Sequence, residues 1–321
     1  MPATLRTTGQ ELISIREIRK RYDGTAALDG FSLDVGAGEL FGLVGPNGAG
    51  KTTLIRILAT LTRPDSGQAT IAGHDVTHEP AVVRALTGYM PDVPGVYQDL
   101  TLEEFLTFFA EAFRLRGAKK RAAVEHALKW SGLVERRHAY VEQLSLGLKQ
   151  RLVLARTLLH EPRVLLLDEP ATGLDPLARI ELREQLKSLN REGVTILLSS
   201  HILSDLEDIC SRVAFIESGR NVAGAGSVLT LGEQARREAL TCEIEIIGDA
   251  AELRAALASY AEARVLESRQ NVFRVEVSGG SQRAADVLRH LVTSGVTVVR
   301  FDPRGPDLED HYRSLFGSKT P

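Results

Sequence analysis

A glycine-rich stretch with one lysine and two threonines is the part of this sequence best suited to hold a chain of phosphates. It runs Gly45-Pro46-Asn47-Gly48-Ala49-Gly50-Lys51-Thr52-Thr53 and fits the phosphate-binding loop pattern G-x-x-x-x-G-K-[ST]. Glycines let the backbone approach a polyphosphate and point successive N–H groups at it. In this pattern Lys51 reaches the β- and γ-phosphates, the Thr52 hydroxyl is a ligand for Mg²⁺, and Thr53 is placed to hydrogen-bond a nearer phosphate.

The residues on either side of the loop predict the context that the motif needs. The apolar run from Leu40 to Val44 predicts a buried strand, and the run from Leu54 to Leu58 predicts a helix. The alternative is a glycine-rich turn that binds no ligand. A strand before and a helix after favour phosphate binding, because the positive end of the helix then faces the anion.

Two adjacent carboxylates, Asp168 and Glu169, follow the fully apolar run from Val164 to Leu167. This arrangement is typical of the second half of a nucleotide site. There the first acid holds Mg²⁺ directly or through water, and the next polarises the attacking water. The alternative is a pair of acids in a turn after a strand, but their place after a phosphate loop favours the catalytic interpretation.

A third polar group follows another predicted strand, residues 195–198, which ends in Ser199-Ser200-His201. A lone histidine after a strand is more often structural. His201, however, is predicted at the carboxyl end of a parallel strand, as Asp168 is, and open α/β sheets bind their ligands at that edge.

Two segments carry weaker signals. Tyr22 lies at the turn between two predicted antiparallel strands, where packing is the usual role of an aromatic ring and stacking on a purine is the alternative. Ser145 and Gly147 begin a predicted helix that extends through residue 159. A serine there is ordinarily an N-cap, and the alternative is phosphate binding at the N-terminus of the helix.

Size and composition narrow the class of protein. A chain of 321 residues is long enough for two domains, and its net charge of -3 gives no general attraction to nucleic acid, so no nucleic-acid partner is expected. The two cysteines, Cys210 and Cys242, lack metal-ligand spacing, which predicts reduced thiols in a cytoplasmic protein. No apolar run approaches the ~20 residues that span a bilayer, and residues 1–10 lack the apolar core of a signal peptide.

The hydrophobic periodicity predicts an α/β domain over residues 11–225, a linker over 226–240 and a small α+β domain over 241–321. Between residues 101 and 143 only helical patterns occur, which predicts a helical insertion over about residues 100–160. The last domain has the predicted order βαββαβ and a closing helix over residues 307–316, an order that suggests a ferredoxin-like fold.

The remaining elements of the first domain are predicted from the same patterns. They are strands at 12–18, 28–35, 68–71, 87–91 and 212–216, and helices at 80–86, 101–115, 120–130, 177–190 and 203–210. In the last domain the strands are predicted at 242–247, 264–267, 272–277 and 296–301, with helices at 250–261 and 281–294.

Residues 11–220 as a whole resemble the ATP-binding-cassette (ABC) ATPases. The resemblance rests on an ordered set of motifs, which are Tyr22, the loop from Gly45 to Thr53, the loop at Asp92, the segment Leu144-Ser145-Leu146-Gly147-Leu148-Lys149-Gln150-Arg151, the pair Asp168-Glu169, Asp175 and His201. It implies a P-loop fold with an antiparallel β subdomain and a helical insertion, and it implies binding and hydrolysis of ATP.

The resemblance also implies a role for each motif. Tyr22 would stack on adenine, while Lys51 and the loop amides would hold the phosphates. Thr52 and Asp168 would hold Mg²⁺, Glu169 would be the general base toward water, and His201 would contact the γ-phosphate. Ser145 and Gly147 would clamp the γ-phosphate of ATP bound to the opposite subunit, with Asp175 at the subunit boundary. One loop and one signature per chain imply a head-to-tail homodimer or heterodimer of ATPase subunits.

Three residues depart from the family pattern. Asp92 stands where the family usually has glutamine; its carboxylate can ligate Mg²⁺ or water, but it cannot donate a hydrogen bond. Leu146 and Leu148 replace the usual first glycine of the signature segment and its glutamine or the residue that substitutes for it. Ser145 and Gly147 remain, so the phosphate clamp is expected to be kept.

The resemblance is strongest to the ATPase subunits of bacterial ABC-2 type exporters. In those proteins, as predicted here, the ATPase is a chain separate from the permease and is followed by a C-terminal domain of strands and helices. The resemblance implies a cytoplasmic subunit held at the inner face of the membrane by an integral membrane permease, which docks on the helical insertion and the loop at Asp92. The alternative is a soluble ABC ATPase that acts on nucleic acid or ribosomes. One cassette, no heptads and an acidic balance favour transport. The C-terminal domain is then either a dimer brace or a regulatory ligand sensor.

Overall fold

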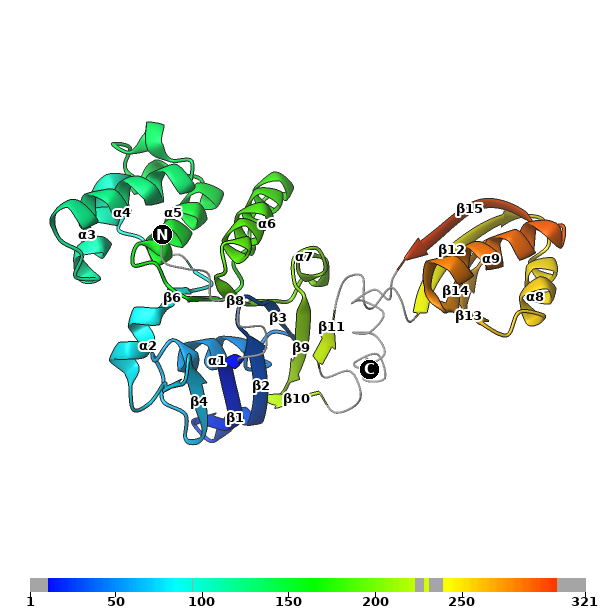
Figure 1. The fold of residues 1–321 in the computed structure, drawn as a ribbon, viewed down its shortest axis with the longest axis horizontal. Helices are drawn as coiled ribbons and strands as arrows, with labels where there is room; N and C mark the ends of the chain where they lie inside the picture. Colours follow the sequence, from blue (N-terminus) through cyan, green and yellow to red (C-terminus); the bar gives the residue numbers. More distant parts are fainter. Residues whose placement is uncertain (1–10, 94, 223–227, 231–238, 305–321) are drawn as a thin grey trace. The chain divides into compact units, whose positions relative to one another are not determined.

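The computed structural model describes residues 11–93, 95–222, 228–230 and 239–304 (Figure 1). The chain divides into two units, Met1–Leu229 and Thr230–Pro321. The linker predicted over residues 226–240 spans this division, and the domain boundaries stay a prediction. The predicted closing helix over residues 307–316 lies outside the described residues.

The first unit is built on a mainly parallel sheet. Its strands lie in the order β10-β9-β3-β8-β7-β6, and β11 also pairs with β9. They are β3 (Leu40–Val44), β6 (Thr87–Met90), β7 (Val164–Leu167), β8 (Thr195–Ser200), β9 (Arg212–Glu217), β10 (Arg220–Asn221) and β11 (Val228–Thr230). The pairs β9–β3, β3–β8, β8–β7 and β7–β6 are parallel, so the carboxyl ends of these strands share one edge.

Helix α1 (Lys51–Leu58) begins directly after the glycine-rich loop and lies between this sheet and a second one. Leu54 and Ile55 of α1 are fully buried in a cluster that includes Ile13 and Phe31 of the second sheet and Leu166 of β7. Burial on both sides fixes the position of the helix, and therefore of its N-terminus, against the carboxyl edge of the parallel sheet.

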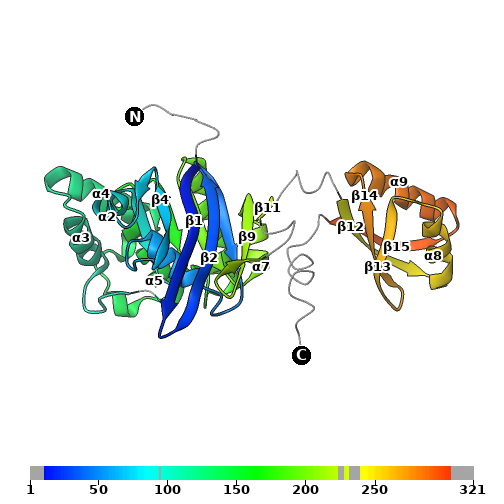
Figure 2. The same ribbon diagram turned by 90° about the horizontal axis from the view of Figure 1, so that it is seen from below.

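The second sheet is antiparallel, with the order β2-β1-β4-β5. Its strands are β1 (Glu11–Tyr22), β2 (Thr25–Gly36), β4 (Ser66–Ile71) and β5 (His74–Asp75). Figure 2 shows β1 and β2 as long strands side by side. The chain turns between them at Asp23 and Gly24, which both have positive φ angles, 45° and 83°.

The helical insertion has a core of its own. It contains α3 (Leu102–Ala112), α4 (Gly117–Trp130) and α5 (Leu146–Leu158), grouped together in Figure 1, with the short 3-10 turns Val134–Arg136 and Val141–Gln143. Thr101 begins α3 with a capping box to Glu104, as the sequence pattern indicates. Among its described residues the insertion has one isolated β-bridge, between Thr101 and Tyr140, and contains no strand. The predicted helical insertion is confirmed.

Three further helices cover the first unit, α2 (Pro80–Leu86), α6 (Pro176–Arg191) and α7 (Leu203–Glu207). The predicted helix over residues 203–210 is therefore too long: the backbone N–H of Ser211 donates to Leu40 O, which draws the chain into β9. The predicted strand over 195–198 is too short, because Ser199 and Ser200 still pair with Leu43 and Val44 of β3. Strands β5, β10 and β11 were not predicted, since two or three residues carry no readable periodicity.

The second unit has the predicted element order βαββαβ. Its elements are β12 (Ala239–Ile247), α8 (Ala250–Ala258), β13 (Ala263–Arg269), β14 (Val272–Ser278), α9 (Gly280–Thr293) and β15 (Thr297–Arg304). The antiparallel sheet has the order β13-β14-β12-β15, and one of its faces packs on the helices through Cys242, Ile244 and Phe273. The other face carries charged pairs such as Glu243 and Arg300, 3.4 Å apart. The ferredoxin-like assignment stays a prediction.

Among the described residues, no helix has both the length and the apolar character needed to cross a membrane.

Candidate active site

The carboxyl edge of the parallel sheet brings the strongest predicted site residues together. The glycine-rich loop follows β3, the pair Asp168-Glu169 follows β7, and His201 follows β8. Strand register places these three chain segments side by side, since β3 and β7 both pair with β8. This agrees with the placement expected from parallel strands in an open sheet.

The glycine-rich loop presents its middle to solvent and buries its end. Pro46, Asn47 and Gly48 are exposed, whereas Ala49 and Gly50 are buried. Gly50 is the N-cap of α1 in a left-handed conformation, with φ 111°. The backbone N–H groups of the first turn of α1 therefore lie beside an accessible loop, which is the arrangement that binds a phosphate.

Two glycines of the loop are also required for packing. A Cβ atom on Gly45 would lie 2.3 Å from the carbonyl oxygen of Ile216, and one on Gly50 would lie 2.4 Å from that of Ala27. Both neighbours are backbone atoms, which cannot move as a side chain can. The phosphate interpretation of the sequence explained these glycines only by the ligand.

We expect Gly45→Ala to lower the free energy of unfolding by about 1–3 kcal/mol, because the new methyl group overpacks against Ile216. Gly95 is the matched control: its Cβ would meet nothing within 4 Å, and Gly95→Ala should change stability by less than about 1 kcal/mol. Urea unfolding of both variants without nucleotide checks this. Equal loss of stability in the two variants would contradict the packing account.

Lys51 is held by the loop and by a carboxylate at once. Its Nζ atom donates to the carbonyl oxygens of Gly45 (2.6 Å) and Pro46 (3.2 Å) and lies 3.3 Å from Glu169 Oε1. Only 6% of the side chain is exposed. The ammonium group is thus fixed at the mouth of the loop, where a phosphate oxygen would add a strong, charge-assisted partner.

Asp168 is fully buried and keeps one oxygen available. Its Oδ1 accepts hydrogen bonds from Thr52 Oγ1 (3.1 Å) and Ser199 Oγ (2.8 Å). Its Oδ2 is buried and accepts no hydrogen bond from the described part of the chain. Burial raises the pKa of this carboxyl group, although the hydrogen bonds from Ser199 and Thr52 oppose the shift. A divalent cation would remove the cost of ionising it here.

The donor set suits Mg²⁺ bound together with a nucleotide. A carboxylate oxygen of Asp168 and the hydroxyl group of Thr52 are neighbouring oxygen donors. Mg²⁺ prefers oxygen ligands and is usually bound through one or two carboxylates, with phosphates and water completing its shell. The described residues hold no cluster of three His, Cys, Asp or Glu side chains that would bind a metal by itself.

Glu169 lies between two nitrogen donors. Its Oε1 is the neighbour of Lys51, and its Oε2 lies 2.7 Å from Nδ1 of His201. Because a carboxylate can only accept, Nδ1 of His201 carries the proton in this arrangement. Thr172 Oγ1 also donates to Oε2, at 3.4 Å. Glu169 has a positive φ of 48°, an uncommon conformation for a side-chain-bearing residue that often marks a functional site.

Ser199 is a site residue that sequence reasoning missed. Its hydroxyl group donates to Asp168 Oδ1 and accepts from the backbone N–H of Glu169 at 3.0 Å, so it orients the Asp168 carboxylate and holds the backbone at Glu169. The one signal in the sequence is its position two residues before His201. Gln150 was missed as well: its buried amide donates to Thr172 O at 3.0 Å and ties α5 to the loop after Glu169.

Tyr22 and Asp92 lie on exposed segments. Tyr22 is the last residue of β1; its exposed fraction is 45%, and Lys20 Nζ lies 5.5 Å from the centre of its ring. Asp92 is exposed two residues after β6, and its carboxylate accepts from the backbone N–H of Val93 at 2.8 Å. The charge of Asp92 adds a smaller contribution than burial does to the raised pKa of Asp168.

Comparison with known proteins agrees with this geometry. The family model described as ABC transporter matches residues 28–172. Over 313 residues the chain is 38% identical to the Nod factor export ATP-binding protein I of Burkholderia pseudomallei (strain K96243). The alignment covers 95% of this chain and 97% of the relative. The chain belongs to the ABC transporter ATP-binding proteins. It is an ABC ATPase, an enzyme that binds and hydrolyses ATP.

Solved structures of other ABC ATPases have the same fold as this one. An ATP-binding subunit of an ABC transporter is 33% identical, with a TM-score of 0.62 over 70% of this chain and 92% of that one. CbiO1 from Clostridium perfringens, described as part of the ABC transporter complex cbiONQ, is 28% identical, with a TM-score of 0.61 over 65% of this chain and 86% of that one. The predicted P-loop fold with an antiparallel β subdomain is confirmed.

Three predicted residues of the ABC ATPase, Ser145, Gly147 and Asp175, cap or flank helices. Ser145 is exposed and caps α5 through the N–H of Leu148 at 3.4 Å. Asp175 is exposed and caps α6 through the N–H of Ala178 at 2.9 Å. A Cβ on Gly147 would lie 3.3 Å from the Cβ of Ala178, so glycine lets α5 approach α6 closely. These ordinary structural roles leave both polar side chains at the surface.

The substituted signature residue Leu146 also has a structural consequence. Its exposed fraction is 44%, and a Cβ on Gly173 would meet its Cδ2 atom at 2.8 Å. The leucine therefore lies against the loop between Glu169 and Asp175. Ser145 is unaffected by this contact and stays exposed.

Proposed function

We propose that this ABC ATPase is the ATP-driven subunit of an exporter and that two such subunits close head to tail around ATP and Mg²⁺ to drive a separate membrane permease. The observation that carries the proposal is the convergence of Lys51, Asp168, Glu169 and His201 at one edge of the parallel sheet. Export is supported by the relative that is named for Nod factor export.

In the proposed reaction the loop amides and Lys51 bind and orient the phosphates. Thr52, through its hydroxyl group, and Asp168, through Oδ2, are the residues that would hold Mg²⁺. When bound, this ion would supply positive charge to the phosphate oxygens. Glu169 accepts the proton of the attacking water. Ser199 keeps the Asp168 carboxylate oriented and fixes the backbone at Glu169, since its hydroxyl group bonds to both.

His201 is proposed to act in two ways. Its Nδ1–H holds Glu169 at 2.7 Å, while 42% of its side chain is exposed at the site and is available to a γ-phosphate. Release of Lys51 from Glu169 when phosphate arrives would leave this histidine as the partner that orients the base. A positioned general base contributes about 10²–10⁴-fold to a hydrolytic rate.

The dimer is supported by the placement of Ser145 and Asp175. Both side chains lie at the surface, and neither hydrogen-bonds to Lys51, Asp168 or Glu169 among the described residues. A phosphate clamp at Ser145 therefore needs a nucleotide that another subunit brings. Two chains facing head to tail supply it twice, once at each of the two sites.

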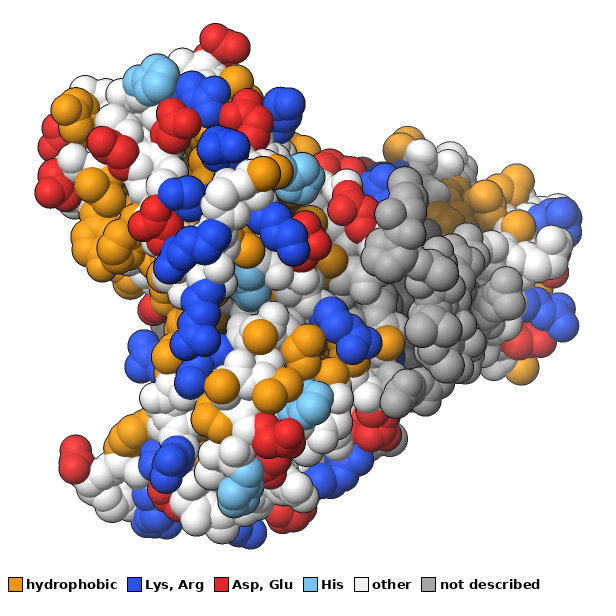
Figure 3. Space-filling model, turned by 60° about the vertical axis from the view of Figure 1, so that its left-hand side comes forward, with side chains coloured by type: hydrophobic (Ala, Val, Ile, Leu, Met, Phe, Trp, Pro, Cys, Tyr) orange, Lys and Arg blue, Asp and Glu red, His pale blue; other side chains and the backbone are white. Residues whose placement is uncertain are grey.

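The permease is proposed to dock on an aromatic patch at the start of the helical insertion, defined as Tyr97, Phe108 and Phe109. The ring centres of Tyr97 and Phe108 are 5.4 Å apart, and those of Phe108 and Phe109 are 5.2 Å apart. Tyr97 and Phe108 are 51% and 48% exposed. Figure 3 shows hydrophobic side chains gathered on this part of the surface, at the upper left. Exposed apolar patches of this kind mark protein contacts.

The aromatic patch is also connected to the parallel sheet through one arginine. Arg156 of α5 lies over the Phe109 ring at 4.9 Å, and the same guanidinium group donates to Tyr89 O in β6 at 3.3 Å. Strand β6 leads directly to Asp92. A partner that binds the aromatic patch is thus connected to the active site through Arg156 and β6. The proposed location of the ATPase is the inner face of the cell membrane, where the permease holds it.

Affinity purification of the native protein tests the proposal. Recovery of a polytopic membrane protein in stoichiometric amount is the expected result. Recovery of ribosomes or DNA without a membrane protein would contradict it and favour the alternative function, in which the ATPase acts on nucleic acid or ribosomes.

We expect Phe108→Ser to reduce recovery of the permease by about tenfold or more, as loss of an aromatic anchor costs at least about 1.4 kcal/mol. ATPase activity of the purified chain should change by less than about twofold, since Phe108 is 48% exposed and lies outside the catalytic cluster. Val292→Ser is the matched control, because Val292 is also exposed (57%) but lies on α9. Equal recovery with both variants would contradict the docking site.

A further inference from the structure

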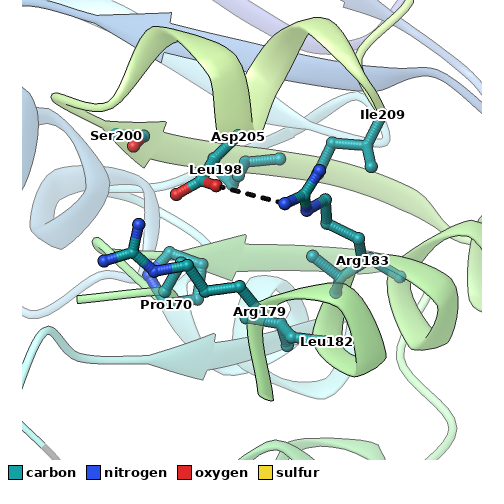
Figure 4. Close-up of a pocket in the computed structure, with 10 residues that line it drawn as sticks. Pro170, Arg179, Leu182, Arg183, Leu198, Ser200, Asp205 and Ile209 are labelled. Atoms are coloured by element: carbon teal, nitrogen blue, oxygen red, sulfur yellow. Dashed lines mark ion pairs between the residues drawn. The ribbon is translucent and has the colours of Figure 1, made fainter. Parts of the chain in front are cut away.

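A small cavity lies between α6, α7 and the end of β8 (Figure 4). Its volume is ≈ 10 Å³, close to the lower limit for one ordered water molecule. Most of the lining is aliphatic, but the charged side chains of Arg179, Arg183 and Asp205 border it. Ser200, the residue before His201, also belongs to the lining. The cavity therefore adjoins the segment that carries the proposed phosphate contact.

Asp205 is the deeply buried charge of this group. Only 7% of its side chain is exposed, and its Oδ1 lies 3.8 Å from Nη2 of Arg183. Its Oδ2 is buried and accepts no hydrogen bond among the described residues. A buried carboxylate is costly unless a cation and hydrogen bonds compensate it. The position of Asp205 is thus tied to the guanidinium group of Arg183.

Arg183 holds two carboxylates of the segment after His201. Its Nη2 faces Asp205, and its Nη1 hydrogen-bonds to Oδ2 of Asp208. The two partners differ in burial, because 57% of the Asp208 side chain is exposed. Solvent screens the pair with Asp208, so that pair contributes little, whereas breaking the buried pair leaves an uncompensated charge.

Arg179 lies one helical turn before Arg183 on the same face of α6. Its Nε donates to the carbonyl oxygen of Leu174 at 3.1 Å, which fixes the residue before Asp175. Figure 4 shows its guanidinium group beside Pro170, across the cavity from Arg183. One helix therefore holds the Asp175 loop with one arginine and the segment after His201 with the other.

Helix α7 depends strongly on this contact because it has only five residues, Leu203–Glu207. Its buried residues are Asp205 and Leu206. Leu206 is fully buried and anchors the helix by apolar packing. Asp205 adds a charged anchor through its ion pair with Arg183, and it lies four residues after His201, whose ring must stay 2.7 Å from Glu169.

We propose that Asp205 is a positioning residue for His201 in ATP hydrolysis, held by Arg183, and that Arg179 and Arg183 make α6 a rigid link between the Asp175 loop and the histidine. The inference rests on the proposed role of His201. It assigns no contact between Asp205 and the nucleotide. Closure at the Asp175 loop is transmitted through α6 to the position of the histidine ring.

The variant Asp205→Asn in the full chain tests this role, because asparagine keeps the shape and removes the charge. We expect kcat for ATP hydrolysis to fall about 10- to 100-fold, since misplacing a catalytic group by about 1 Å costs up to about 100-fold. KM for ATP and the binding of a nonhydrolysable ATP analogue should stay within about twofold. The matched control is Asp208→Asn, which removes the exposed partner of the same arginine and should leave kcat within about twofold.

A second comparison separates positioning from general loss of structure. If Asp205 acts through His201, the double variant Asp205→Asn with His201→Ala will have the kcat of His201→Ala alone, within about twofold. Single-turnover measurements give the rates when turnover is slow. An equal fall of kcat in both backgrounds, or an unchanged kcat in Asp205→Asn while His201→Ala is impaired, would overturn this inference alone. Normal kcat in His201→Ala would overturn the proposed role of His201.

Should Asp205→Asn fail to fold by circular dichroism, Arg183→Gln and Arg183→Lys replace it. Lysine keeps a cation near Asp205 and should retain more kcat than glutamine, with KM unchanged in both. Equal kcat in the two variants and in the unaltered protein would overturn the inference.

Discussion

Replacing Glu169 by glutamine will lower kcat for ATP hydrolysis by about 10²–10⁴-fold, the contribution of a general base, while ATP is still bound. Glutamine has nearly the same shape, so its side-chain oxygen can still accept the hydrogen bond that His201 Nδ1 makes at 2.7 Å. It cannot accept the proton of the attacking water. Because Lys51 also loses its carboxylate partner at 3.3 Å, the ammonium group is more available to phosphate.

The measurement is steady-state phosphate release beside a nucleotide-binding titration. The control is Glu192→Gln, an exposed acid at the end of α6, for which less than about twofold change is expected. ATP should hold the Glu169→Gln variant as a dimer that gel filtration separates from the monomer of 35.0 kDa. Normal turnover in Glu169→Gln would show that another group is the base.

Replacing Asp168 by asparagine will separate stability from activity. Asparagine keeps an oxygen for the hydrogen bonds from Thr52 and Ser199 but removes the buried charge. Metal-assisted stabilisation is worth several kcal/mol, so ATP hydrolysis with Mg²⁺ should fall at least about 100-fold. The melting temperature without nucleotide should rise, because burial disfavours the ionised form of Asp168.

The sign of the stability change follows from the pKa. Burial raises the pKa of Asp168 in the folded chain above its usual value of 3.8. Protonation therefore favours the folded state at low pH, and this contribution is lost as the pH rises through the folded pKa. The advantage of Asp168→Asn should be largest at neutral pH and should disappear below the usual value.

Thermal melting at neutral and acidic pH, with and without Mg²⁺ and ATP, checks the account. Unaltered protein should gain melting temperature from Mg²⁺ with ATP, and Asp168→Asn should gain much less. A variant that melts lower than the unaltered protein at neutral pH without nucleotide would contradict the cost assigned to the buried carboxylate.

The elements that the sequence predicted well have signals confined to short, continuous segments. The loop from Gly45 to Thr53 is one motif, and the run from Val164 to Leu167 is apolar throughout, so each is recognised from its own residues. Helix α2 over Pro80–Leu86 has the bounds that its periodicity and proline predict. The parallel order of the strands then brings separate segments to one edge, which is how His201 comes to lie beside Glu169.

The residues that were missed act across large separations in the sequence. Ser199 bonds to Asp168 across 31 positions and Gln150 to Thr172 across 22. A serine in a strand and a glutamine in a helix carry no local sign of such partners. Asp205 is similar, since an acid in a polar-looking helix is usually at the surface, and its burial depends on Arg183 of another helix.

The central claim is that ATP is held between two subunits. The most direct test is a structure of the Glu169→Gln variant with ATP and Mg²⁺, in which the distance from Ser145 Oγ to the nearest γ-phosphate oxygen is measured. We predict about 2.5–3.0 Å to the γ-phosphate of the nucleotide bound at Lys51 of the other copy. A nucleotide bound at Lys51 with Ser145 of every copy facing solvent would contradict the claim.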